Sequence, residues 1–239
     1  MDLSGKTIYG PTVSVNLKKP DLRQKNPGKG DYVLGKEYFD NQIAELRADM
    51  EYVAIDITNV SNDIGTAELG QTVDTVKIMW TLNKQATSLT VDGSEVKVTA
   101  DSVKLTDLQL KAQKTFTVTA TDERGATDSG TTTVNFYNGV YYGAAVAGVV
   151  PDSAAIMELS KRLQSGRGVS IPYTPSDGKR PTYACPSRYG TPKFTIGPNE
   201  YAWTKLGTIA FKNASGYSEK YDVWQHPQDI SENITIVVS

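Results

Sequence analysis

The sequence predicts a mainly β, modular protein: an extended N-terminal arm and a short coiled-coil helix, then an immunoglobulin-like β-sandwich, then a β-rich C-terminal domain with one helix. Three observations predict it. Apolar residues near the N-terminus follow a heptad spacing, short alternating runs broken by turn residues fill the middle, and similar runs continue to the end. The chain of 239 residues is long enough to bury a large core.

Residues 1–37 form the predicted arm. The segment is rich in glycine, contains Pro11, Pro20 and Pro27, and has few large apolar side chains, so it cannot build a core of its own. Its lysine and arginine residues outnumber its acidic residues. We interpret it either as a solvated extended segment or as an attachment arm that docks on another protein.

Residues 38–64 carry an apolar spacing that alternates steps of four and three, which is the a/d pattern of a coiled coil. The residues between are mostly polar, so a narrow seam for self-association is predicted. The second half has only β-branched residues at a and d, which favours a trimer over a dimer. Two alternatives remain, a helix packed on its own β domain and a strand over 53–60. The seam residues are Phe39, Ile43, Leu46, Met50, Val53, Ile57, Val60 and Ile64.

Residues 65–137 contain short apolar–polar alternations separated by turn signals. Asp92-Gly93 is a strong hairpin turn, and Asp122 to Gly125 turns the chain again. About seven short strands in about 70 residues predict an immunoglobulin-like sandwich. Trp80 is then a core residue. Such a sandwich is shared by unrelated activities, so it indicates no chemistry by itself.

Residues 138–239 predict a compact β-rich domain. One helix is expected from about Ser153 to Gln164, with Asp152 or Ser153 as its cap and Gly166 as its stop. The rest alternates in the manner of strands joined by turns. The expected strands cover residues 169–173, 182–185, 193–196, 204–211, 219–223 and 234–238.

Charge and hydropathy exclude several functions. The formal net charge is -2 with no long run of one sign, so nucleic-acid binding is not expected. The N-terminus lacks the basic and apolar regions of a signal peptide. The longest apolar stretch, roughly Val140 to Val150, is too short to span a bilayer. We expect a chain that folds in a cytoplasm and does not insert into a membrane.

A search for catalytic groups predicts no enzyme, no cofactor and no metal site. His226 is the one histidine and lies in a turn ended by Pro227, where a solvated side chain is expected. Cys185 is expected to be a buried, inert thiol, because no second histidine is present to activate it. A glycan-cleaving pair would need two opposed carboxylates. Glu200 and Asp222 are conceivable, but nothing in the sequence pairs them.

Aromatic residues are the remaining candidates. Eight tyrosine and tryptophan residues concentrate between residues 173 and 224. Exposed rings of this kind can stack on sugars or anchor a protein, whereas core packing is the simpler interpretation of each one. Trp203, in a turn-like run, is the first to test. The candidates for glycan or partner contact are Tyr183, Tyr189, Tyr201 and Trp203.

Three regions resemble structural proteins of tailed bacteriophages. Residues 20–33 resemble the Q-x-[DN]-P-x-x-x-D-Y-[IV] segment found ahead of the helical stalk in many fibre and appendage proteins. Leu22-Arg23 stands where an aromatic residue often precedes the glutamine, which is a departure from the pattern. The matching residues, which the resemblance implies dock on the virion, include Gln24, Asn26, Pro27, Asp31 and Tyr32.

The resemblance extends over most of the chain. Residues 119–127 and 136–143 are similar to the immunoglobulin-like repeats of phage structural proteins, and residues 189–194 and 221–224 to the domain that often follows. It implies a virion component, a tail or head fibre or a baseplate or neck decoration, assembled in the bacterial host cytoplasm. The implied partners are further copies of itself, another virion protein and a host-surface glycan. The alternative is a bacterial surface carbohydrate-binding or adhesion module, against which the missing signal and anchor argue.

Overall fold

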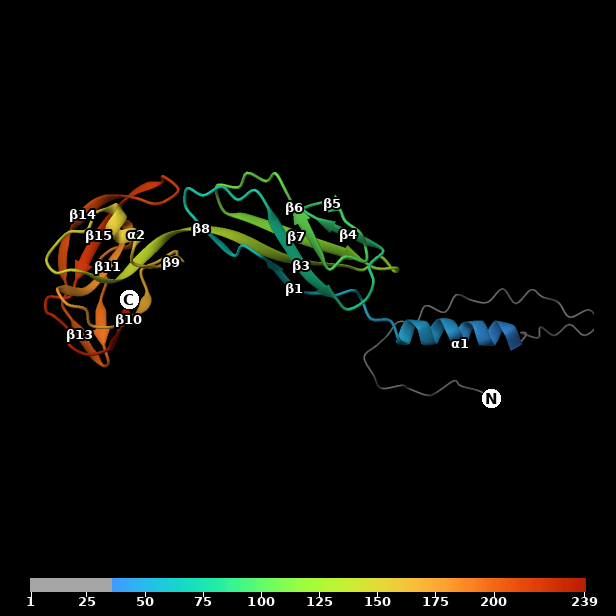
Figure 1. Cartoon of the computed structure of the whole chain (residues 1–239). Helices are drawn as coiled ribbons and strands as arrows, with labels where there is room; N and C mark the ends of the chain where they lie inside the picture. Colours follow the sequence, from blue (N-terminus) through green and yellow to red (C-terminus); the bar gives the residue numbers. More distant parts are fainter. Residues whose placement is uncertain (1–35) are drawn as a thin grey trace, which may run out of the picture. The chain divides into compact units, whose positions relative to one another are not determined.

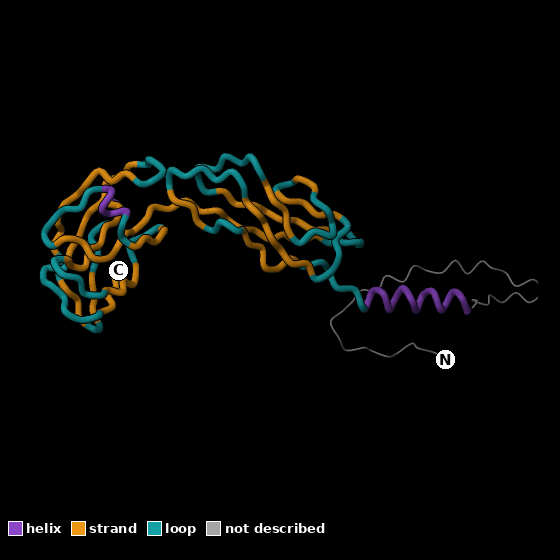
Figure 2. Tube along the Cα trace, in the orientation of Figure 1, coloured by secondary structure: helices purple, strands orange, loops and turns teal. Residues whose placement is uncertain are grey.

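The computed structural model describes residues 36–239, with side chains from Asp40 onward. Strands account for most of the elements in this part of the chain (Figure 2). Contacts divide the protein into a unit that ends at Val53 and a second unit that spans Ala54–Ser239. The mainly β fold class is confirmed.

The helix α1 (Lys36–Met50) ends long before Ile64, so the predicted helical seam is wrong in its second half. Ile57 and Val60 lie in strand β1 (Ile57–Asn62), where Ile57 is buried. β-branched side chains fit a pleated strand better than a helix, and the sandwich core stabilises the strand further. The preference for a trimer depended on Val53, Ile57, Val60 and Ile64, all of which lie beyond the end of α1, so it loses its basis.

Residues 54–137 form what we call the sandwich lobe. One sheet has the order β1-β3-β6, and β8-β7-β4-β5 forms the facing sheet, with β2 added to β8 in parallel. Phe116 and Val118 of β7 and Trp80 of β3 point into one hydrophobic core, as the alternation predicted. The other strands of the lobe are β2 (Thr66–Glu68), β3 (Val76–Leu82), β4 (Ser88–Val91), β5 (Ser94–Glu95), β6 (Ser102–Leu105) and β7 (Lys114–Thr121).

The turn between β4 and β5 is the predicted Asp92-Gly93 hairpin. Both residues have positive φ, 48° for Asp92 and 78° for Gly93, as the favoured two-residue turn requires. The Asp92 carboxylate accepts a hydrogen bond from the Thr117 backbone N–H at 2.9 Å and pairs with Lys114 at 2.7 Å. The turn is therefore held against β7.

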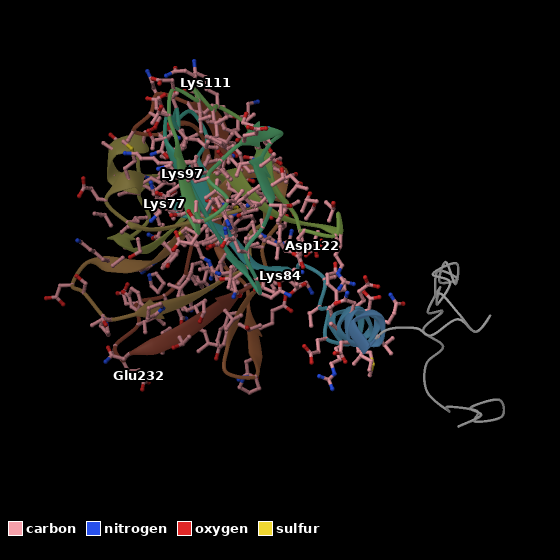
Figure 3. The ribbon with its side chains drawn as sticks, turned by 90° about the vertical axis from the view of Figure 1, so that its right-hand side faces the viewer. Lys77, Lys84, Lys97, Lys111, Asp122 and Glu232 are labelled. Carbon is pink, nitrogen blue, oxygen red and sulfur yellow. The ribbon has the colours of Figure 1, made fainter. Side chains whose placement is uncertain are left out.

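The buried carboxylate of Asp122 fixes the point where the chain enters the sandwich. Its Oδ2 accepts from the Ile55 N–H at 3.2 Å and pairs with Lys84 Nζ at 3.0 Å, as the neighbouring labels in Figure 3 indicate. Its Oδ1 accepts from the N–H groups of Arg124 and Ala126 in the turn that follows. A buried carboxylate needs such donors to offset its desolvation.

A single strand, β8 (Thr127–Val146), serves both halves of the second unit (Figure 1). Its first part pairs with β7 up to Val134, its middle with β2, and its last part with β9 (Ser160–Gln164) and β11 (Lys179–Pro186). The predicted boundary at residue 137 therefore falls inside a continuous strand. No linker separates the two halves at this point.

Residues 138–239 form what we call the terminal lobe. The sheet β14-β15-β11-β8 has buried residues on both faces, and the second sheet, β10-β16-β12-β13, covers one of them. All six predicted strands are present. They correspond to β10 (Val169–Tyr173), β11, β12 (Phe194–Ile196), β14 (Thr204–Lys212), β15 (Ser218–Gln225) and β16 (Ile234–Val238), with β13 (Asn199–Tyr201) and the short 3-10 helix η1 (Ser187–Tyr189) in addition.

The predicted helix of the terminal lobe is only partly right. Its first five residues form α2 (Ser153–Met157), and its last five form β9 after a two-residue turn. The Asp152 cap is confirmed, because its carboxylate accepts from the Ala155 N–H at 2.8 Å. Beyond α2 the chain pairs with Asn138–Tyr142 of β8, so ladder hydrogen bonds replace helical ones.

Candidate functional site

The exposed apolar face of α1 is the first candidate. Every described side chain of this helix is exposed except Gln42, which is half-buried. Ile43 is 49% exposed, Leu46 36% and Met50 76%, and their spacing places them on one face. An isolated helix of about 15 residues is only marginally stable in water. A partner that covers this face would therefore stabilise the helix.

A buried polar network joins the two lobes of the second unit. Glu68, at the end of β2, is 3% exposed. Its carboxylate accepts a hydrogen bond from the Tyr141 hydroxyl at 3.0 Å and pairs with Lys161 Nζ at 2.8 Å. Burial and then the Glu68 charge raise the pKa of Tyr141 well above its usual range, so the phenol stays a donor. The sequence shows no signal for this network, because Glu68 lies 73 residues from Tyr141 and 93 residues from Lys161.

A second contact strengthens the same junction. The Asn213 side chain donates to the carbonyl of Leu69 at 2.7 Å. Gly70 has φ of 92°, and a Cβ at this position would lie 2.6 Å from the Cβ of Tyr217. Only glycine permits both this conformation and this approach. The turn after β14 is therefore packed closely on the sandwich lobe.

The structure separates the four predicted aromatic candidates. Tyr183 is fully buried, and Trp203 is 8% exposed and stacks on Phe194 with centroids 3.9 Å apart. Neither ring is therefore free to stack on a sugar. Tyr189 is half-buried and donates from its hydroxyl to the Gln164 carbonyl at 2.8 Å. Tyr201 is 40% exposed and is the candidate that remains accessible.

Tyr201 lines an open pocket of about 280 Å³ in the terminal lobe. We call this the Tyr201 pocket. Its wall is Ile196 of β12 and the segment after β15, and its polar groups come mainly from that segment. The lining includes Ile196, Tyr201, His226, Gln228, Asp229 and Glu232. Sequence reasoning identified Tyr201 but missed the others, because no local pattern brings residues 226–232 beside β13.

His226 is buried, so the expected solvated side chain is wrong. Only 5% of the residue is exposed, and its ring stands edge-on to Trp203 with centroids 5.8 Å apart. Nδ1 lies 2.8 Å from the Gln228 carbonyl and 3.2 Å from the Gln228 N–H. The proline that follows suggested a surface turn, but the aromatic neighbours supply the burial.

Cys185 is buried as predicted. Burial raises the pKa of its thiol to about 11, so the thiolate is scarce near neutral pH. A nucleophilic role requires the thiolate. The structure therefore supports a packing role for this residue.

Asp222 and Glu200 are held in separate environments. Burial acts to raise the pKa of Asp222, but hydrogen bonds from Lys205, Thr208 and Ser187 outweigh it and hold the pKa below its ordinary value. Glu200 is exposed and pairs loosely with Lys193 at 3.7 Å. A depressed pKa suits a structural carboxylate better than a general acid.

The predicted docking residues Gln24, Asn26, Pro27, Asp31 and Tyr32 lie outside the described residues. Within residues 36–239, no helix combines the length and the apolar character needed to cross a membrane.

Comparisons with known proteins give little. No protein-family model and no curated protein matches the chain. Among solved structures, one described as an anomalous substructure of Titin-A168169 has 10% identity and a TM-score of 0.25, covering 77% of this chain and 97% of that one. The Bacteroides ovatus mixed-linkage glucan utilization locus protein SGBP-B, in complex with a heptasaccharide, has 17% identity and a TM-score of 0.22, covering 79% and 44%.

The N-terminal eight immunoglobulin domains of the Down Syndrome Cell Adhesion Molecule match with 9% identity and a TM-score of 0.20, covering 74% of this chain and 23% of that one. Similarity at this level says nothing about function.

Proposed function

We propose that the chain is an oligomeric structural subunit of a bacteriophage particle. The N-terminal segment attaches it, α1 joins copies of it, and the two fused β lobes are displayed. The exposed apolar face of α1 is the observation that carries this proposal. The sequence resemblance to phage appendage proteins is the reason for assigning the chain to a phage particle. The strand β8, which is shared by both lobes, suits a structural part that must resist mechanical force.

The occupant of the α1 face is a second copy of this chain. Ile43, Leu46 and Met50 follow the heptad spacing, and the flanking positions are polar, as in a self-associating seam. Two heptads are short, so association would be weak unless the attachment arm also gathers copies at one place.

Light scattering of the purified full chain tests self-association. Because the seam is short, the measurement is made at high protein concentration, where the parent should give a multiple of 26.0 kDa. The double substitution Ile43→Asp with Leu46→Asp should give the mass of one chain, because each copy would place two carboxylates in the seam. Ala44→Asp, an exposed position off the seam, should keep the parent mass. A parent that runs as one chain would overturn this part of the proposal.

Peptide mass spectrometry tests the particle assignment. Particles purified from the phage whose genome carries this gene should contain the chain at a fixed copy number. That number should be a multiple of the solution oligomer. Particles that contain no peptide of the chain would overturn the virion assignment and would favour the surface-adhesion alternative.

A further inference from the structure

The Tyr201 pocket differs from the other surfaces of the terminal lobe because an accessible ring lies over a buried aromatic stack. Tyr201 has its centroid 6.3 Å from His226, which stands on Trp203, which stacks on Phe194. A ring supported in this way loses little freedom when it binds a ligand. Tyrosine presents an apolar face with a polar tip, which suits ligands of mixed polarity.

An imidazole nitrogen without a protein partner belongs to a residue that lines this pocket. His226 is one of the lining residues, although only 5% of it is exposed. Both contacts of the ring to Gln228 use Nδ1, so Nε2 has no hydrogen-bond partner among the described residues.

We propose that the Tyr201 pocket binds one uncharged sugar ring at the end of a surface glycan. A sugar hydroxyl both donates and accepts, so it can pair with Nε2 of His226 in either tautomer. The apolar face of the ring would lie on Tyr201. The pocket volume of about 280 Å³ is close to the lower end for small-ligand sites, which suits one ring better than a chain of them.

The charges of the pocket select against acidic sugars. Asp229 is fixed by Arg180, whose Nε lies 2.6 Å from Oδ1, so Oδ2 is left to accept from a hydroxyl. Glu232, labelled in Figure 3, is exposed. It has no ion-pair partner within residues 36–239. Two carboxylates against one guanidinium leave the pocket negative, which favours hydroxyl donors and repels a uronic or sialic acid.

A divalent cation is the less suitable occupant. Within the described residues, no group of three or more His, Cys, Asp or Glu side chains lies close enough to hold a metal ion. Calcium prefers six to eight oxygen ligands. The sugar interpretation uses the aromatic ring and the free imidazole nitrogen, which the cation interpretation leaves unexplained.

The biological role of sugar binding rests on the proposed function, in which the β lobes are displayed on a phage particle. The binding experiment itself does not depend on that function. The parent chain is applied to an array of oligosaccharides that end in glucose, galactose, mannose or N-acetylglucosamine, beside matched ones that end in glucuronic acid. We expect binding to at least one uncharged end group and none to glucuronic acid. Multivalent display on the array compensates for a weak single site.

Two variants and a control assign the binding to the pocket. Tyr201→Ala should weaken it about tenfold, a typical loss for one aromatic contact. Glu232→Gln should reduce the preference for uncharged over acidic ends by about fivefold. Tyr217→Ala removes a tyrosine of similar exposure, 37%, elsewhere in the same lobe and should change nothing.

The outcomes separate this inference from the proposed function. Absence of binding to every uncharged end group, or equal binding by the parent and Tyr201→Ala, overturns the pocket inference while the mass and particle results stand. Conversely, the monomeric Ile43→Asp, Leu46→Asp chain should still bind sugar at the same pocket. If it does, failure of the oligomer proposal leaves this inference intact.

Discussion

The sandwich lobe and the terminal lobe hold themselves together in different ways. The sandwich lobe buries mainly aliphatic residues, and its β7–β8 surface carries exposed hydroxyl pairs such as Thr119 with Ser129. The terminal lobe buries large aromatic rings together with polar groups. The buried polar residues of the terminal lobe are Asn138, Thr182, Asn213, Asp222, Gln225 and His226, whereas those of the sandwich lobe are Glu68 and Asp122. Aliphatic burial is non-directional, whereas buried polar groups demand defined partners.

This difference separates two roles. A lobe held mainly by non-directional packing, with fewer buried polar groups, tolerates changes on its surface, which suits a spacer. A lobe held by buried hydrogen bonds keeps its loops in defined positions, which suits a surface that recognises something. The two lobes are connected through β8 and the Glu68 network, so a substitution that destabilises one lobe should also destabilise the other.

The largest expected effect comes from emptying the sandwich core. Phe116→Ala removes a side chain that is 1% exposed and should cost about 3–5 kcal/mol. Because β8 pairs with β7 in one lobe and with β11 in the other, the protection of backbone amides against hydrogen exchange should fall in both lobes. Hydrogen exchange followed by mass spectrometry of peptides from β7 and β15 measures this. Loss confined to β7 would mean that the lobes unfold independently.

A smaller effect should come from the buried carboxylate of the terminal lobe. Asp222→Asn should cost about 1.5–3 kcal/mol at neutral pH, because charged hydrogen bonds are lost. The folded-state pKa of Asp222 is depressed, so its stabilisation is present above the ordinary carboxyl range near pH 4 and is lost as pH falls through the folded pKa.

Urea unfolding between pH 7 and pH 2 measures the difference in the free energy of unfolding between the parent and Asp222→Asn. This difference should shrink as the pH falls below about 4. Glu200→Gln, at an exposed carboxylate, is the control and should lie close to the parent throughout. A difference that stays constant to pH 2 would mean that the Asp222 charge does not contribute.

The junction between the lobes should be sensitive at Gly70. Gly70→Ala and Gly93→Ala both place a Cβ on a left-handed backbone, which costs about 1–2 kcal/mol. Only at Gly70 would the added atom meet another, 2.6 Å from Tyr217 Cβ, whereas nothing lies within 4 Å at Gly93. The melting temperature should therefore fall further for Gly70→Ala. Equal losses would show that the junction adjusts freely.

Local patterns predicted the strands well and the helices poorly. The alternation around Trp80 and the Asp92-Gly93 turn are local signals, and the structure agrees with both. The same heptad spacing, however, runs from Ile43 on a helix to Ile57 in a strand. Apolar spacing alone does not distinguish a helix from a strand. The β-branched residues after Met50 do, and they were the reason for the alternative of a strand over 53–60.

The candidate site was less predictable because it depends on distant pairs. Tyr201 was identified by residue type, but the burial of Trp203 depends on Phe194, which only the fold brings beside it. His226 looked like a loop residue for the same reason. Similarly, β9 replaces a predicted helix because the edge of β8 offers it hydrogen bonds, and the sequence of residues 160–164 does not carry that information.

The smallest expected effect compares one substitution in the two lobes. Thr119→Val removes an exposed hydroxyl that is 2.9 Å from Ser129 and should cost less than about 1 kcal/mol, because valine also suits a strand. Thr182→Val removes a hydroxyl that is buried, donates to the Arg180 carbonyl and accepts from Gln225.

Thr182→Val should cost about 1–3 kcal/mol, since Gln225 is left without one of its partners. Denaturant midpoints of the two variants give the ratio directly. A ratio near one would remove the distinction drawn between the lobes, because it would show that buried polar groups contribute no more than a solvated surface pair. If Thr182→Val loses much more stability than Thr119→Val, the buried hydrogen bonds of the terminal lobe contribute more than the exposed pair of the sandwich lobe. The lobe that carries the Tyr201 pocket is then the one that depends on defined hydrogen-bond geometry.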